Sequence, residues 1–304
     1  MTGTGCEIAG AGAADMERMR VWAEEEGWNP GDSDRFAFAA ADPEGFLIGR
    51  VDGEPVACIS AVRYGSDFGF IGFYIARPAF RGQGYGIRLW RAGMERLRGR
   101  LVGLDGVVAQ QDNYRRSGFR PAWNNTRLEG VPGGALGAGG AVLPGGARVS
   151  GGAGAAGGAA GVELVDAGSL PFAQLAAYDR RFFPASRDAF LSLWTALPGR
   201  TALVAVRDGR IAGLGVVRPS AGPARVGPLY ADDPEVAAAL LRGLARHAFD
   251  GRISVDVPDA NAGAAGLLAG LGLVPTFETA RMYTGPAPEA ALAGIYGVTS
   301  LELG

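Results

Sequence analysis

Residues 70–86 combine a strand, a glycine-rich turn and the start of a helix, an arrangement that few folds accommodate. Apolar and aromatic side chains fill the predicted strand, and Pro78 ends it because proline has no N–H to give to a sheet. Glycines at positions 82, 84 and 86 leave successive backbone N–H groups accessible to an anion. The helix that follows directs the positive end of its dipole to the same point. The segment therefore predicts a phosphate site, and a pyrophosphate site in particular.

Three kinds of glycine loop compete for this segment. A P-loop requires Gly-Lys-Ser/Thr, and the chain contains no lysine. A dinucleotide-binding fold requires Gly-x-Gly-x-x-Gly directly after a strand, with an acidic residue about 20 positions later. Asp105 lies near that distance and keeps this alternative open, although the glycine spacing differs and no repeated strand–helix pattern follows.

The third kind is the coenzyme A loop of the Gcn5-related N-acetyltransferase (GNAT) family, which the segment resembles. The family's loop reads Arg/Gln-x-x-Gly-x-Gly/Ala after a strand that ends in Val-x-Pro, and Ala76-Arg77-Pro78 stands at the latter position. The resemblance implies acetyl-CoA as co-substrate, with the pantetheine arm added to the sheet as an extra strand. The coenzyme-binding residues that it implies are Tyr74, Ile75, Ala76, Arg81, Gly82, Gln83, Gly84, Tyr85 and Gly86.

The composition narrows the class of protein. The 304 residues are 48% hydrophobic and 20% charged, which suits one large or two modest globular domains. The net charge of −2 gives no reason to expect a nucleic-acid or membrane partner. Neither a signal peptide nor a run of about 18 apolar residues is found, so we expect a cytoplasmic protein. Two cysteines make no disulfide framework, Cys58 is expected to be buried, and the single histidine, His247, predicts no metal site.

Residues 130–161 interrupt the apolar patterning. They are mostly glycine and alanine, and Arg148 is their only charged residue, so we predict a flexible linker. The linker separates an expected N-terminal coenzyme-binding domain, residues 1–129, from an expected C-terminal domain, residues 162–304.

The first half is predicted to begin with two helices and to continue with a hairpin about Asp52-Gly53. Its predicted helices are 13–26, a short one after Asp32 or Ser33, 84–98 and 111–117, and its strands are 46–51, 55–64, 68–76, 101–104 and 119–128. This order resembles the acetyltransferase fold over residues 10–129. The resemblance implies an α/β (α+β) protein with a mixed, mostly antiparallel sheet flanked by helices.

The same order recurs after the linker, so we expect two tandem copies of one fold. The predicted strands are 162–165, 201–207, 210–218, 225–230, 253–257 and 279–283, and the helices are 169–178, 187–196, 234–249 and 261–271. The second copy lacks the glycine loop. Asp232 and Asp233 would repel a pyrophosphate, and Asp233 is better interpreted as the cap of a helix that begins at Pro234. We therefore expect a non-catalytic half that walls the acceptor site or supports a dimer, with a second active site as the alternative.

The resemblance also implies a proton donor. Tyr114-Arg115-Arg116-Ser117-Gly118-Phe119 matches the family's Tyr-x-x-x-Gly-Phe, in which the tyrosine hydroxyl faces the thioester sulfur. A tyrosine pKa near 10 suits a donor that is protonated at pH 7. The family usually has asparagine seven residues earlier, where this chain has Val107, and the alternative is a tyrosine that only packs under the closing strand.

The general base is not evident. Many family members use a glutamate on the central strand, and residues 68–76 contain no carboxylate. The candidates are the Glu24–Glu26 cluster and Asp105, and Glu26, Trp28 and Asn29 are candidates for binding a cationic amine. The alternatives are a solvated helix end, a turn at Asp105 and a water relay.

These observations predict an N-acetyltransferase that moves an acetyl group from acetyl-CoA to a small-molecule amine by direct attack in a ternary complex. The alternative is a non-catalytic acyl-CoA-binding sensor or partner-binding module, and a protein-modifying acetyltransferase is a third option. We expect a monomer or a homodimer, with no nucleic-acid or membrane partner and no metal.

Overall fold

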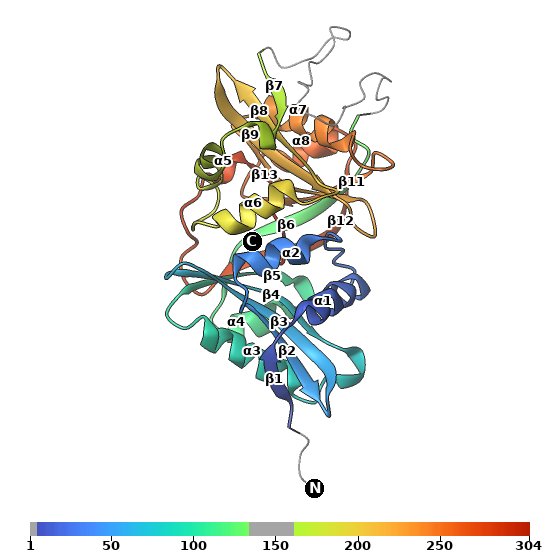
Figure 1. Ribbon diagram of the computed structural model, residues 1–304, viewed down its shortest axis with the longest axis vertical. Helices are drawn as coiled ribbons and strands as arrows, with labels where there is room; N and C mark the ends of the chain where they lie inside the picture. The colour runs from blue at the N-terminus through green and yellow to red at the C-terminus, as the bar shows by residue number, and fades with distance from the viewer. Residues whose placement is uncertain (1–4, 134–160) are drawn as a thin grey trace.

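The computed structural model describes residues 5–133 and 161–304, and Figure 1 shows two halves stacked along the long axis. The predicted linker falls mostly on residues 134–160, outside the described part. In the first half, the expected elements are present together with an additional first strand, β1. The elements are β1 (Glu7–Gly10), α1 (Ala13–Glu25), α2 (Asp34–Ala41), β2 (Phe46–Val51), β3 (Glu54–Tyr64), β4 (Phe68–Ala76), α3 (Tyr85–Arg96), β5 (Leu101–Val107), α4 (Gln111–Arg116) and β6 (Arg120–Gly130).

The second half repeats this order, as predicted, and adds a short last strand, β13, that the sequence did not indicate. Its elements are β7 (Glu163–Asp166), α5 (Phe172–Asp179), α6 (Asp188–Ala196), β8 (Thr201–Arg207), β9 (Arg210–Arg218), β10 (Ala224–Ala231), α7 (Pro234–Ala245), β11 (Ile253–Pro258), α8 (Ala264–Gly270), β12 (Val274–Tyr283) and β13 (Ile295–Gly297). The predicted fold class, a mixed and mostly antiparallel sheet flanked by helices, is confirmed. No helix of the described residues is both long and apolar enough to cross a membrane.

Local sequence explains several of the turns. Asp52 and Gly53 both have positive φ (50° and 81°), as do Asp208 and Gly209 (51° and 72°), which is the backbone of the two-residue hairpin turn that the sequence predicts. The predicted helix cap is also confirmed, because the Asp233 carboxylate accepts a hydrogen bond from the Val236 N–H at 2.9 Å.

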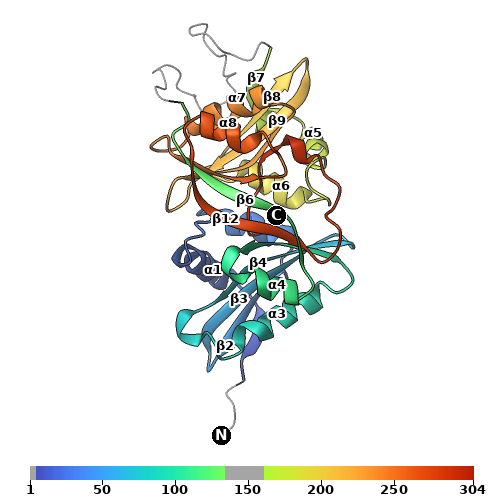
Figure 2. The same ribbon diagram turned by 180° about the vertical axis from the view of Figure 1, so that it is seen from behind.

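The two halves share one sheet by exchanging strands. The strand order is β1-β2-β3-β4-β5-β12-β6-β11-β10-β9-β8-β7, and β13 pairs with β10. Strand β12 of the second half thus lies between β5 and β6 of the first, while β6 pairs with β11 of the second. Figures 1 and 2 show β6 and β12 crossing the middle of the molecule. Each half therefore depends on a strand of the other to continue its sheet.

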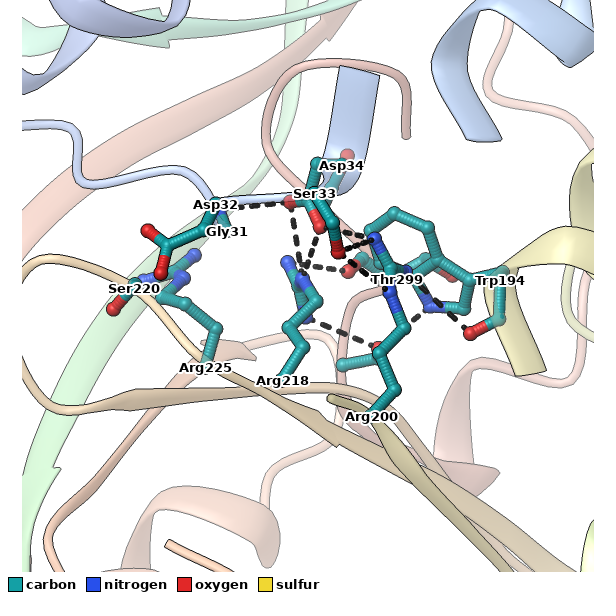
Figure 3. Close-up of polar contacts among 12 residues, drawn as sticks. Gly31, Asp32, Ser33, Asp34, Trp194, Arg200, Arg218, Ser220, Arg225 and Thr299 are labelled. Carbon is teal, nitrogen blue, oxygen red and sulfur yellow. Dashed lines mark hydrogen bonds and ion pairs between the residues drawn. The ribbon is translucent and has the colours of Figure 1, made fainter. Parts of the chain in front are cut away.

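A buried ion cluster connects α2 to the second half (Figure 3). The Asp34 carboxylate accepts from Arg218 Nε at 3.0 Å and from Arg200 at 2.8 Å, and all three side chains are almost fully buried. Both guanidinium groups lie 4.4 Å from the centre of the Trp194 ring. Arg218 also donates to the carbonyl oxygens of Gly227 and Thr299, at 3.2 and 3.5 Å. One carboxylate thereby serves as the shared counter-charge of two arginines, and Arg218 in turn holds two backbone carbonyl groups.

The C-terminal segment lies between the two halves, where both views place the chain end. Residues 295–304 are all buried. Arg187 donates to the Gly304 carbonyl oxygen at 3.2 Å, and the Tyr64 hydroxyl donates to that of Leu303 at 3.0 Å. The segment packs directly on β4, because a Cβ placed at Gly72 would overlap the Glu302 carbonyl oxygen. Glycine at position 72 is what lets the two backbones approach.

We predict that Asp34→Ala destabilises the protein by about 3–5 kcal/mol, because it leaves two buried guanidinium groups without a counter-charge. Denaturant unfolding measures the change. Asp112→Ala, which breaks the exposed pair with Arg115, serves as the control and should change stability by less than about 1 kcal/mol. Equal effects for the two variants would contradict the assigned role of the cluster.

We predict that Gly72→Ala lowers stability by about 1–3 kcal/mol, because the added methyl group must displace the C-terminal segment. Thermal unfolding measures the change. In the matched control, Gly266→Ala in α8, the new methyl group meets nothing within 4 Å, and stability should be unchanged or slightly higher. A wild-type melting temperature for Gly72→Ala would show that the segment does not press on β4.

Candidate active site

A cleft opens where β4 and β5 separate. Their parallel pairing joins Phe68–Ile71 to Leu101–Leu104 and ends there. Two residues later, Phe73 has a φ of 45°, and the register of β4 against β3 shifts at the same point. The Cys58 thiol, buried as expected, donates to the Phe73 carbonyl oxygen at 3.1 Å. Past this irregularity, residues 74–76 of β4 do not pair with β5, which leaves an edge that an extended ligand can join.

The cleft has a volume of about 680 Å³ and extends to the glycine loop. Gly82 and Gly84 have φ of 77° and 83°, and a Cβ at either position would meet no atom within 4 Å. Gly84 is the N-cap of α3 and offers no side chain to the first N–H groups of the helix. These N–H groups and the helix dipole suit a phosphate, so the residues present fit the pyrophosphate of a coenzyme A molecule.

Most of the predicted coenzyme residues line the cleft, and two do not. The lining includes Tyr74, Ile75, Ala76, Arg81, Gly82, Gly84 and Gly86. Gln83 instead donates to the Ala79 carbonyl oxygen at 3.0 Å, and the Tyr85 ring lies near Phe80. Arg81 donates to the Ala76 carbonyl oxygen at 2.8 Å and forms an ion pair with Glu26.

A second, smaller cavity of about 40 Å³ adjoins the cleft. The two cavities share Trp28, Tyr74, Val107, Tyr114 and Phe277 in their linings. The C-terminal half contributes Phe277, Thr279, Leu301 and Glu302 to the smaller one. The strand exchange thus brings second-half side chains to the β4–β5 opening of the first half.

Tyr114 lies at the junction of the two cavities and is 9% exposed. Its ring packs beside Trp90 and over Gly106, where a Cβ would lie 2.7 Å from the ring. Burial raises the pKa of Tyr114 above its usual value, so the hydroxyl is protonated at neutral pH and is available as a hydrogen-bond and proton donor.

The predicted acceptor residues are separated. Trp28 lines both cavities, and Glu26 lines the cleft while paired with Arg81. Asn29 is absent from both linings, because its amide nitrogen donates to the Ser220 hydroxyl at 3.0 Å and its oxygen accepts from the Gly222 N–H at 3.2 Å. Asn29 therefore joins the two halves in this structure.

The interpretation of Asp105 as a turn residue is wrong. Strand β5 continues to Val107, because β12 pairs with it and places Arg281 opposite Asp105. The Asp105 carboxylate accepts two hydrogen bonds from Arg281 and one from Asn125, each at 2.7 Å. With its oxygens bonded in this way, Asp105 is a poor candidate for a free base.

Sequence reasoning missed Thr279 as a lining residue and Glu302 altogether. Thr279 was assigned to a strand of the second half, and its place in the first half's opening follows only from the strand exchange. Glu302 follows the last predicted element, and no motif marks it. The one available signal was an acidic residue between two leucines, Leu301 and Leu303, in an apolar context.

Comparisons with known proteins find acetyltransferase relatives for both halves of the chain. Residues 13–119 match the acetyltransferase (GNAT) family, and residues 175–297 match an acetyltransferase (GNAT) domain. Holothin acyltransferase of Pseudoalteromonas sp. (strain SANK 73390) is 30% identical over 295 residues, covering 96% of this chain and 93% of that protein.

Two solved structures share the whole architecture. A putative acetyltransferase from Pyrococcus horikoshii has a TM-score of 0.77 at 20% identity, covering 100% of this chain and 98% of the other. A tandem GNAT protein from the clavulanic acid biosynthesis pathway has a TM-score of 0.61 at 17% identity, covering 93% and 100%. With a full-length acyltransferase relative and a match in each half, the chain belongs to the GNAT family of acyltransferases and is a tandem member of it.

Proposed function

We propose that the protein is an acyl-CoA-dependent N-acyltransferase that transfers an acetyl group from acetyl-CoA to the amine of a small molecule in a ternary complex. The observation that carries this proposal is the junction of the two cavities at Tyr114. A thioester that enters along the cleft would meet, at this tyrosine, a nucleophile held in the smaller cavity.

The coenzyme would occupy the larger cleft. Its pyrophosphate would lie at the loop of Gly82 and Gly84, and its pantetheine arm along the free edge of residues 74–76. This placement brings the carbonyl group near the irregularity at Phe73, where backbone groups of β4 do not pair with β5. A backbone N–H there is suited to stabilise the oxyanion that forms during acyl transfer.

The smaller cavity, of about 40 Å³, suits the amino group of an acceptor, and the rest of a larger acceptor would extend into the adjoining cleft. Its walls include Trp28 and Phe277, whose ring faces attract a cation or stack on a flat ligand. In the reaction, the C–N bond forms as the C–S bond breaks, and Tyr114 gives its proton to the departing sulfur. The full-length relative acts on holothin according to its name, so holothin is the first acceptor to test.

We predict that acetyl-CoA binds at one site per chain and that Gly84→Val weakens binding about 10-fold to 100-fold, by blocking access to the loop N–H groups. Isothermal titration calorimetry measures both. Gly99→Val is the matched control, because Gly99 has nearly the same φ (81° against 83°) and equally open surroundings but lies outside the cleft. Two binding sites per chain would mean that the second half also binds the coenzyme. Equal affinities of Gly84→Val and Gly99→Val for acetyl-CoA would exclude the glycine loop as the binding site.

We predict that Tyr114→Phe lowers kcat about 10²-fold to 10⁴-fold while acetyl-CoA binding is retained, because only the proton donor is removed. Amine-dependent release of free coenzyme A measures the rate. Tyr178→Phe serves as the control, because Tyr178 lies in the second half and lines neither cavity. An unchanged rate in a folded Tyr114→Phe protein would remove Tyr114 from the mechanism. Tight coenzyme binding by the wild-type chain, with no turnover on any amine, would favour a sensor instead.

A further inference from the structure

We infer that Glu302, on the C-terminal segment of the second half, is the catalytic base that takes the proton from the acceptor amine. This inference rests on the proposed function and adds to it the group that the central strand lacks. It would make the second half a direct participant in the reaction at the first half's cleft.

The position of Glu302 is fixed by its backbone. Its carbonyl oxygen lies against Gly72, the first residue of β4 past the end of its pairing with β5. Both backbone polar groups of the next residue, Leu303, are hydrogen-bonded. Its carbonyl oxygen accepts from the Tyr64 hydroxyl at 3.0 Å, and its N–H donates to Ser300 Oγ at 3.1 Å. Glu302 is thereby a lining residue of the smaller cavity, as Tyr114 is.

The Glu302 carboxylate lacks the partner that buried carboxylates need. The residue is 3% exposed, and its Oε2 atom accepts no hydrogen bond from any described residue. By contrast, the buried carboxylates of Asp34, Asp105, Asp179 and Asp256 are each paired with an arginine. An unpaired buried carboxylate costs free energy that a bound donor would recover.

A second polar group in the same cavity is also unsatisfied. Thr279 Oγ1 is buried and has no hydrogen-bond partner among the described residues, and Thr279 lines the cavity with Glu302. The remaining walls are largely apolar and aromatic, apart from Asp105, whose carboxylate is bonded to Arg281 and Asn125. A ligand with several N–H donors matches a carboxylate and a hydroxyl oxygen, and a primary amine or its ammonium ion is the smallest such ligand.

The surroundings of Glu302 suit a base. The charged groups that act on it are Arg225, Asp34, Arg218 and Arg127. These arginines share their carboxylate partners, since Arg218 and Arg200 pair with Asp34, and Arg127 and Arg225 both pair with Asp256. Burial outweighs their attraction and raises the pKa of Glu302 above its usual value. A carboxylate with a raised pKa accepts a proton from an amine more readily than a solvated one does.

The proton balance of the step is complete. Glu302 takes one proton from the ammonium group, and the free amine nitrogen attacks the thioester carbonyl carbon. The C–N bond forms and the C–S bond breaks, so that the electron pair leaves with the sulfur. Tyr114 protonates the thiolate and regains a proton from the amide nitrogen as it forms. Glu302 returns its proton to solvent, so the products are the amide, free coenzyme A and one proton.

The test compares pH–rate profiles of the wild type, Glu302→Gln and Glu302→Asp in the full chain, with coenzyme A release as the readout. In the wild type, kcat/KM should rise with pH as Glu302 loses its proton. Glu302→Gln should lower kcat about 10²-fold to 10⁴-fold and lose this acid limb, while binding of acetyl-CoA in calorimetry is unchanged. Glu302→Asp should keep the limb at a reduced rate, because the carboxylate is retracted by one methylene group.

Glu278→Gln is the matched control, since Glu278 is an exposed glutamate of β12 that lines neither cavity.

The outcomes separate the two proposals. An active wild type with an unchanged rate and acid limb in Glu302→Gln would overturn the role of Glu302 and leave the proposed function intact. A wild type that turns over no amine would overturn both. If Glu302→Gln fails to fold, Glu302→Asp decides: a reduced rate with the limb retained supports the base, and a wild-type rate excludes it.

Discussion

The insertion of β12 between β5 and β6 is the constraint on which the rest of the structure depends. Two hydrogen-bonded ladders hold it there, and the ion pair between Arg281 and Asp105 lies directly across one of them. The insertion brings Phe277 and Thr279 to the opening between β4 and β5. It also sets the path of the chain beyond Tyr283, which returns between the halves and ends on β4. The smaller cavity exists in this form only because the strands are exchanged.

The helix after the fourth strand of each half begins differently, at α3 in the first half and at α7 in the second. Helix α3 begins after a glycine in the left-handed region and has no side-chain cap, so its first N–H groups face the cleft. Helix α7 begins at Pro234, and the Asp233 carboxylate accepts one of its first N–H groups and pairs with Arg207. An anion at α7 would compete with a carboxylate that is already bound. The second half therefore retains the fold, and its corresponding helix start is capped by a carboxylate where that of α3 is not.

Local features of the site could be predicted from the sequence because each depends on residues close together in the chain. The glycine loop, the hairpin turns at Asp52-Gly53 and Asp208-Gly209, and the helix of Tyr114 are of this kind. The strand exchange could not be predicted, since β6 and β12 both mix polar and apolar residues and their sequences do not indicate which strand each one pairs with. The error at Asp105 has this origin: a carboxylate before a glycine resembles a turn until Arg281, 176 residues away, is placed opposite. Glu302 escaped notice because an acidic residue after the last element normally belongs to a solvated end.

The exchanged strands also bear on how the molecule is assembled. Residues 5–130 alone would present an unpaired edge of β5 and an unpaired β6, and such edges invite association with other chains. Because Arg281 of β12 lies 176 residues after Asp105 of β5, the opening between β4 and β5 acquires its second wall only through contacts of long sequence separation. Contacts of such long sequence separation are slow to form. The halves are thus not interchangeable modules, and a GNAT unit transplanted from another protein would have to bring a compatible partner strand with it.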